Sequence, residues 1–155
     1  MASFVSFASA TAMRIVGAAA VILGGLIAAV TGPLELSKGS WAAAYLVLVA
    51  GAAQVVMGSA RQHWMRSGSD AQGWAQFASW NVGNLAVLIG TSAGSTVAVF
   101  AGAALLVVAL VLAFLATFRL QGRADRMLLL GFRILLVLLA VSIPIGVTLS
   151  AIRNA

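Results

Sequence analysis

Long stretches without a charged side chain set the strongest limit on what this 155-residue chain can fold into. No Asp, Glu, Lys or Arg occurs in residues 15–34, 39–60 or 71–118. The first two stretches have the length of an α-helix that crosses a hydrocarbon core of about 30 Å. A soluble domain could not cover so much apolar surface, because only 8% of the sequence is charged, against about 25% in typical soluble domains. The sequence therefore predicts an all-α integral membrane protein whose main partner is the lipid bilayer.

Turn residues and charges divide the chain into five predicted transmembrane helices. The third uncharged stretch is too long for one span and is interrupted by Gly, Ser and Thr residues at positions 90–96, which favour a turn. Gly32 and Pro33 are expected to end the first helix, and Pro144 is expected to kink the last. The predicted helices, within a single membrane domain of residues 1–155, are about 12–31, 41–60, 73–90, 96–118 and 127–152.

The distribution of basic residues predicts the orientation in the membrane. One predicted set of loops contains Arg14, Arg61, Arg66, Arg119, Arg123 and Arg126. The opposite set contains only Lys38 and Arg153. Because cytoplasmic loops carry an excess of Lys and Arg, we expect a cytoplasmic N-terminus and an external C-terminus in the cell membrane. Arg133, about two turns into the last helix, is expected to extend its side chain back to the cytoplasmic interface.

Small residues recur at helical spacing and predict where the helices pack. Lipid tails provide no hydrophobic drive for helix association, so close approach at small residues and polar contacts must stabilise the bundle. The predicted packing positions are Gly24, Gly51, Gly58, Gly73, Gly83 and Gly146. The fourth predicted helix consists mostly of Leu, Val and Ala and is expected at the periphery, facing lipid.

Polar side chains inside the predicted second and third helices are the best candidates for function. An amide in hydrocarbon must find a hydrogen-bond partner, either on a neighbouring helix or along a polar path. Both interpretations remain open at this point. If a solute path exists, its predicted lining is Gln54, Phe77, Ser79, Trp80, Asn81 and Asn84.

Several kinds of chemistry have little support in the sequence. There is no Cys, and the single His63 lies in a predicted basic loop beside Trp64. The three acidic residues, Glu35, Asp70 and Asp125, also fall in predicted loops. We therefore expect no catalytic residues, no metal site and no cofactor, and hence no enzyme. The net charge of +6 is explained by membrane topology, so no nucleic-acid partner is expected.

Two short motifs resemble the acetate/succinate permease family. The second predicted helix reads Gly51-x-Ala53-Gln54-x-x-x-Gly58, and the third begins Gly73-x-x-x-Phe77-x-Ser79-Trp80. In that family, a Gly-x-Ala-Gln-x-x-x-Gly helix and a cytoplasmic loop precede a Gly-x-x-x-Phe-x-Ser-Tyr helix. The resemblance covers about residues 50–146 and implies transport of a small carboxylate by a ring-like homo-oligomer. Trp80 replaces the usual Tyr, the family's Asn-Pro-Ala-Pro-Leu-Gly signature is absent, and five spans are predicted where the family has six.

Two functions follow as hypotheses. The first is a small-solute permease or channel-like protein, whose solute is a small organic anion such as a monocarboxylate. The second is a non-catalytic accessory or scaffold subunit of a larger membrane complex. In the second case the polar side chains would only join helices to one another.

Overall fold

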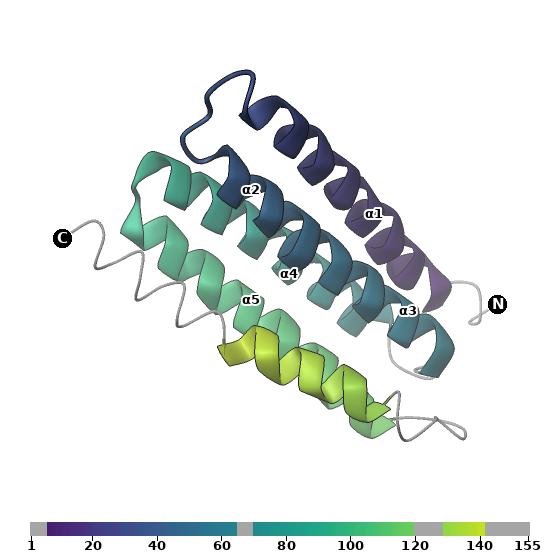
Figure 1. Ribbon diagram of the computed structural model, residues 1–155. Helices are drawn as coiled ribbons and strands as arrows, with labels where there is room; N and C mark the ends of the chain where they lie inside the picture. The colour runs from purple at the N-terminus through teal and green to yellow at the C-terminus, as the bar shows by residue number, and fades with distance from the viewer. Residues whose placement is uncertain (1–5, 65–69, 120–128, 142–155) are drawn as a thin grey trace.

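The computed structural model describes residues 6–64, 70–119 and 129–141, and every regular element in those ranges is a helix (Figure 1). The chain begins with α1, Ser6–Thr31, and returns through α2, Gly39–Tyr45. The π-helical segment η1, Leu46–Ala53, and α3, Gln54–Trp64, continue directly from α2 and form one long rod with it. Then come α4, Asp70–Ala93, α5, Thr96–Ala116, the short 3₁₀ segment η2, Thr117–Arg119, and a helix over Leu129–Val141.

Three of the described helices are long and apolar enough to cross a membrane, as expected for a membrane protein. They are Ala8–Thr31, Gly39–Gln62 and Thr96–Ala116. The 24-residue helix α4 is long enough but is more polar, because it contains Gln72, Gln76, Asn81 and Asn84. The helix over Leu129–Val141 is apolar but short within its described part. The all-helical prediction is thus confirmed for the described ranges.

Two helix ends differ from the predicted ends. Helix α1 begins at Ser6 rather than near Ala12, and α4 continues past Gly90 to Ala93. The break between α4 and α5 is narrow: Gly94 adopts a φ of +70°, and the Ser95 hydroxyl accepts a hydrogen bond of 3.4 Å from the Ala98 amide. This is ordinary N-capping after a left-handed residue. Pro144 and Gly146 lie outside the described residues.

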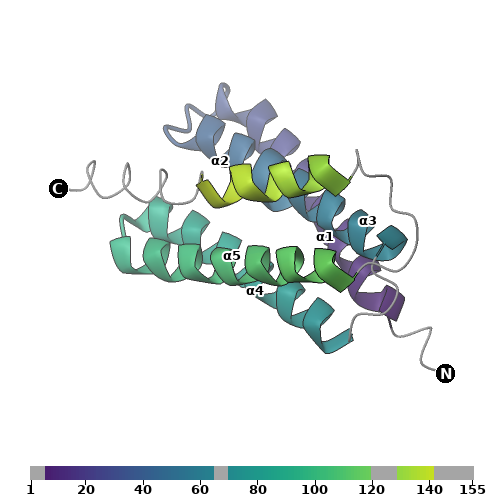
Figure 2. The same cartoon turned by 90° about the horizontal axis from the view of Figure 1, so that it is seen from below.

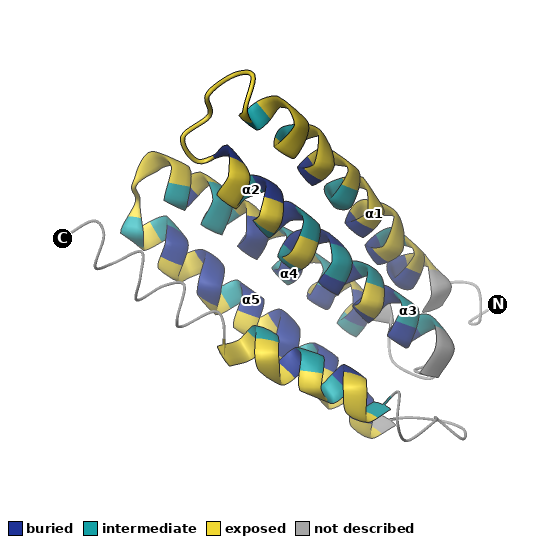
Figure 3. Cartoon of the chain, viewed as in Figure 1, coloured by how far each residue is buried: buried dark blue, intermediate teal, exposed yellow. Residues whose placement is uncertain are grey.

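The α2–η1–α3 rod lies at the centre of the arrangement. Figure 1 shows α1 along one side of the rod, and Figures 1 and 2 both show the helix Leu129–Val141 beside α5. Helix α1 packs mainly on η1 and α3, whereas α4 and α5 form an antiparallel hairpin. Most of α1 is exposed except for one narrow buried stripe (Figure 3).

Helix α5 contributes to the core, so its predicted peripheral position is wrong. Its side chains Leu106, Ala109, Leu110 and Ala113 are buried. They belong to one apolar cluster with Ala116 of the same helix. The other members are Ala53, Met57 and Ala60 of the central rod, Trp80 of α4, and Phe132 and Leu136 of the last described helix. Alanines recur on the buried side of α5, at Ala103, Ala109, Ala113 and Ala116. The larger residues Val107, Val111 and Leu115 remain exposed on the opposite side.

The closest approach between α4 and α5 is at a pair of glycines. A Cβ atom added to Gly83 would lie 2.9 Å from the main-chain oxygen of Gly102, and one added to Gly102 would lie 2.7 Å from that of Gly83. Such separations are too short for a side chain, so the two backbones touch only because both positions are glycine.

Lys38, in the loop between α1 and α2, connects this loop to the end of α4. Its ammonium group donates to the main-chain oxygens of Thr91, at 2.8 Å, and of Ser92, at 3.3 Å. Those carbonyls lie in the last turn of α4, where intrahelical donors run out and a cation is favoured by the helix dipole.

Candidate functional site

Trp80 is one of the two most buried of the predicted site residues. Its side chain is 1% exposed and contacts the apolar cluster formed by the central rod and α5. The indole Nε1 donates a hydrogen bond of 3.4 Å to the main-chain oxygen of Ala50 in η1. Trp80 thereby packs in the interface between α4 and the central rod.

The two asparagines of α4 bond to their own helix. The side-chain amide of Asn81 donates to the Phe77 carbonyl, and that of Asn84 donates to the Trp80 carbonyl, both at 2.8 Å. Asn81 is half-buried, whereas Asn84 is buried, and the Asn84 Oδ1 atom has no hydrogen-bond partner in the described structure.

Gln54, the first residue of α3, is also buried. Its side chain is 1% exposed, and its Nε2 atom has no partner among the described residues. Phe77 and Ser79 are half-buried, and the Phe77 ring meets Trp74 edge-on at 5.5 Å between centroids. The predicted path residues therefore separate into a buried group, Gln54, Trp80 and Asn84, and a half-buried group, Phe77, Ser79 and Asn81.

The predicted packing glycines lie at helix contacts. Gly24 approaches Ala43 and Val47, and Gly51 approaches Gly17 and Val21. The other described positions are Gly58, beside Ala10 and Met13; Gly73, beside Ser9 and Arg61; and Gly83, beside Gly102 and Leu106.

A buried arginine lies where the sequence predicted a loop. Arg61 is part of α3 and is only 5% exposed, so its assignment to a loop is wrong. The reason is local: helix α3 continues to Trp64, and the neighbouring α1 and α4 cover the arginine. Its Nη1 atom donates to Oε1 of Gln76 at 3.5 Å.

Arg61 belongs to a polar cluster at the meeting point of three helices, formed by Ser9 of α1, Arg61 of α3, and Gly73 and Gln76 of α4. We call this group the Arg61 cluster. A Cβ atom added to Gly73 would overlap the Ser9 hydroxyl and would lie 2.7 Å from Nε of Arg61, so both groups lie directly over this glycine. The Ser9 Oγ atom is fully buried and has no partner in the described part of the chain.

Gln76 connects the cluster to the apolar core. It is 3% exposed, accepts from Arg61 through Oε1, and directs Nε2 at the Met57 sulfur at 3.5 Å. A sulfur is a weak acceptor, so the hydrogen bond that the Gln76 amide donates to Met57 is weak. The cluster thus combines a guanidinium, a hydroxyl and an amide, a set of donors suited to a carboxylate.

The spacing of residues in the sequence indicates part of this cluster, although the predicted path lining does not include it. Gln76 is three residues after Gly73 and four before Trp80, which places all three on one helix face. Arg61 is seven residues after Gln54 and therefore shares its face of α3. The second helix is predicted to end at Ala60 because the uncharged stretch ends there, and that criterion takes no account of which residues share a helix face.

Two pockets are found away from the Arg61 cluster. One lies between α1 and α2, and the other between α5 and the last described helix. Neither includes Gln54, Asn81 or Asn84 among its lining residues. Across the described ranges, no three His, Cys, Asp or Glu side chains come together in a way that could hold a metal ion.

No protein-family model, curated protein or solved structure matches this chain.

Proposed function

We propose that the chain is a five-span protein of the cell membrane with a cytoplasmic N-terminus and an external C-terminus. Helix α4 supports a fourth span, because its 24 residues extend about 36 Å. The helix that begins at Leu129 supports a fifth, because the uncharged sequence continues from Ile134 to Ile152. The start of α1, the end of α3 and the end of α5 carry the excess of arginines, and we place these ends on the cytoplasmic side because cytoplasmic loops are rich in Lys and Arg.

The function we propose is passage of a small organic anion, of the monocarboxylate type, rather than catalysis. The observation that carries this proposal is the buried Arg61, bonded to Gln76 and adjacent to the unpartnered hydroxyl of Ser9. A charged side chain inside a membrane protein is costly to bury, and in most proteins it marks a substrate or ion pathway. The planar guanidinium can bind a carboxylate through two parallel hydrogen bonds.

Two further buried amides extend the same polar line into the bundle. Gln54 precedes Arg61 by seven residues and Asn84 follows Gln76 by eight, so each lies about 10–12 Å farther along its helix. The contacts Met57–Gln76 and Ala50–Trp80 show that the central rod and α4 run antiparallel, so both steps go in the same direction. Gln54 Nε2 and Asn84 Oδ1 would supply the next polar contacts for an anion that leaves the Arg61 cluster.

Uptake into vesicles tests this proposal directly. The purified protein is reconstituted into liposomes, and entry of labelled acetate and labelled succinate is compared with entry into empty liposomes. We expect saturable acetate uptake that is lost in Arg61→Gln. The matched control is Arg14→Gln, which removes the same charge from an exposed arginine that bonds to Gln62 near the same end of the bundle. Equal uptake by protein-containing and empty liposomes would overturn the proposal.

An accessory or scaffold subunit is the second candidate, and one observation favours it. Asn81 and Asn84 use their amide donors within α4, and Trp80 fills the interface with η1, as in a rigid packing module. Extraction in a gentle detergent followed by mass spectrometry would then recover a partner protein in fixed stoichiometry. Recovery of a homo-oligomer alone, as the permease resemblance implies, would count against this candidate.

A further inference from the structure

An arginine of the last described helix packs against an aromatic ring at the end of α5. Arg133 is half-buried, and its guanidinium carbon lies 5.3 Å from the centre of the Phe118 ring in η2. The buried Nε atom of Arg133 has no hydrogen-bond partner among the described residues. Glu35, the one acidic side chain that the structure describes, lies in the α1–α2 loop at the opposite end of the bundle. No described carboxylate therefore balances the charge of Arg133.

An apolar groove of about 280 Å³ lies between α5 and the last described helix. Every lining residue is apolar: Val107, Leu110, Val111, Phe114, Leu115, Leu136, Val137 and Ala140. Helix α5 is long and apolar enough to cross a membrane, and the groove residues Val107, Val111 and Leu115 are exposed. Hydrocarbon is therefore the medium that borders the groove.

Arg133 lies at one end of this groove. Leu136 and Val137 follow it by three and four residues, so all three share one face of their helix. On α5, Phe114 lines the groove and meets Phe118 edge-on, with 5.3 Å between the ring centroids. A cation at the end of a membrane helix is thus continuous, through two aromatic rings, with an apolar groove that leads toward the middle of α5.

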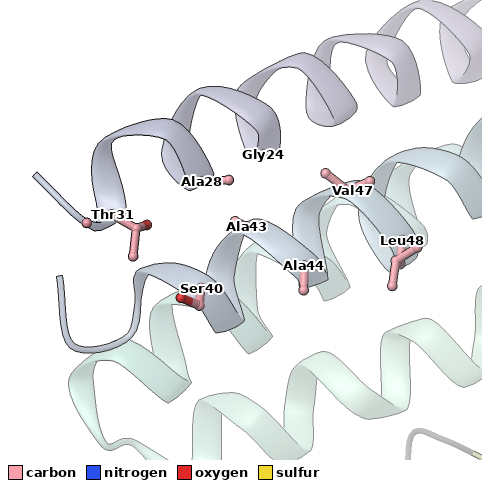
Figure 4. Close-up of a pocket in the computed structure, with 9 residues that line it drawn as sticks. Gly24, Ala28, Thr31, Ser40, Ala43, Ala44, Val47 and Leu48 are labelled. Atoms are coloured by element: carbon pink, nitrogen blue, oxygen red, sulfur yellow. The ribbon is translucent and has the colours of Figure 1, made fainter.

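The pocket between α1 and α2 lacks this combination (Figure 4). Its walls include small residues such as Gly24 and Ala28, and no charged side chain lines it. The ammonium group of the neighbouring Lys38 already bonds to two carbonyls at the end of α4. Nothing in that pocket selects a ligand, whereas the α5 groove has a cation at one end.

We propose that Arg133 and the α5 groove bind an anionic phospholipid, with the phosphate at Arg133 and one acyl chain along the groove. The planar guanidinium can donate two parallel hydrogen bonds to phosphate oxygens. A cation in a membrane helix is costly without an opposite charge, and the Phe118 ring offsets only part of that cost. An anionic lipid supplies the opposite charge, and its acyl chain covers the exposed apolar walls. A zwitterionic lipid binds less strongly, because its headgroup also carries a cation.

Photocrosslinking with two matched probes tests the proposal. The full-length protein is reconstituted in phosphatidylcholine vesicles that contain a phosphatidylglycerol or a phosphatidylcholine probe, each with a diazirine in its acyl chain. Labelled residues are identified by mass spectrometry. We expect the phosphatidylglycerol probe to label Val111, Leu115 and Ala140 about tenfold more than the other probe, because hydrogen bonds between charged groups are strong. Equal labelling by the two probes at the groove would overturn the proposal, as would the same preference at the exposed Ile22 of α1.

Variants of the arginine separate a specific site from general attraction to a basic surface. Arg133→Gln should remove the tenfold preference, and Arg133→Lys, which keeps the charge but not the paired donors, should retain part of it. The matched control is Arg14→Gln, which removes an exposed arginine near the same end of the bundle and should leave the preference unchanged. A preference that persists in Arg133→Gln, or that falls equally in Arg14→Gln, would contradict the proposed site.

A second pair of variants tests the groove without changing a charge. Ala140→Phe fills the groove from an exposed wall and should lower the labelling of Val111 by the phosphatidylglycerol probe. Val141→Phe, at the next residue and outside the lining, should leave it unchanged. Elution volume in detergent identifies the variants that fold normally. Unchanged labelling in folded Ala140→Phe would overturn the proposal.

Two further measurements distinguish the lipid from other occupants. Excess unlabelled phosphatidylglycerol should abolish the preference, whereas inorganic phosphate should not. Loss of the preference with inorganic phosphate would show a site for free phosphate and overturn the lipid proposal. The chain has no Cys, so Val111→Cys introduces a single thiol in the groove. A high yield of disulfide-linked dimer in vesicles would place a second copy on the groove and would also overturn the proposal.

Discussion

The indole nitrogen of Trp80 donates a 3.4 Å hydrogen bond to the main-chain oxygen of Ala50, and this bond ties α4 to the π-helical segment of the central rod. A π-helix pairs each carbonyl with an amide five residues on, and such segments are often found at functional sites. Here the large buried ring and the π-helical segment share one interface. The bond therefore fixes α4 against the helix that carries Gln54 and Arg61.

We expect Trp80→Phe to destabilise the protein by about 1–3 kcal/mol, because it removes a buried donor and leaves a small void. Thermal unfolding in detergent, followed by circular dichroism, measures the loss. Trp74→Phe is the matched control on the same helix, since Trp74 is 42% exposed. Equal shifts for the two variants would show that the Trp80 bond adds no specific stability.

The Gly83–Gly102 contact predicts a sharp difference between two glycines. Gly102→Ala should lower stability by about 1–3 kcal/mol, because the new methyl group would overlap the backbone of α4. Gly25→Ala should be neutral or stabilising by about 1 kcal/mol, because its Cβ would meet no atom within 4 Å and alanine favours helix. The two midpoints are compared under the same detergent conditions, and a stabilising Gly102→Ala would contradict the close helix contact.

Asn84 separates the two functional proposals. If an anion passes along the buried face of α4, Asn84→Leu should abolish acetate uptake without changing the elution volume of the protein. Asn81→Leu should keep most of the uptake, since Asn81 lies at the half-buried edge of the same helix. Aggregation or dispersal of an oligomer in Asn84→Leu, with no measurable uptake by the wild type, would instead favour the scaffold.

The proposed topology predicts the location of the C-terminus. A reporter enzyme that is active only outside the cell, fused after Ala155, should be active. A second reporter, active only in the cytoplasm, should be inactive at the same position. The reverse result would contradict the proposed topology, either in the number of spans or in the orientation.

The lengths of the uncharged stretches were enough to predict the helices, but not which face of each helix is buried. Uncharged stretches located α1, the central rod and α5, because a membrane helix must be apolar over most of its length. The same rule misplaced Arg61, since one arginine near the end of a helix can be buried by neighbouring helices without shortening it. The predicted lining on α4 combined the buried Trp80 and Asn84 with the half-buried Phe77, Ser79 and Asn81, and it left out the buried Gln76.

The role of α5 could not be read from its composition. Leu, Val and Ala suit lipid and core equally well in a membrane protein, so hydrophobicity alone does not distinguish the two environments. The close approach of α4 depends on Gly102 of α5 and Gly83 of α4 together, and the composition of α5 alone does not reveal that pairing.

The Lys38 contact has a consequence for the order in which the protein is made. Its acceptor Thr91 is encoded 53 residues later, and the chain emerges from the ribosome N-terminal end first. The loop after α1 therefore cannot acquire this contact until the whole of α4 has been synthesised and inserted. During biogenesis the first hairpin must persist on its own helix contacts, and the arrival of α4 completes it.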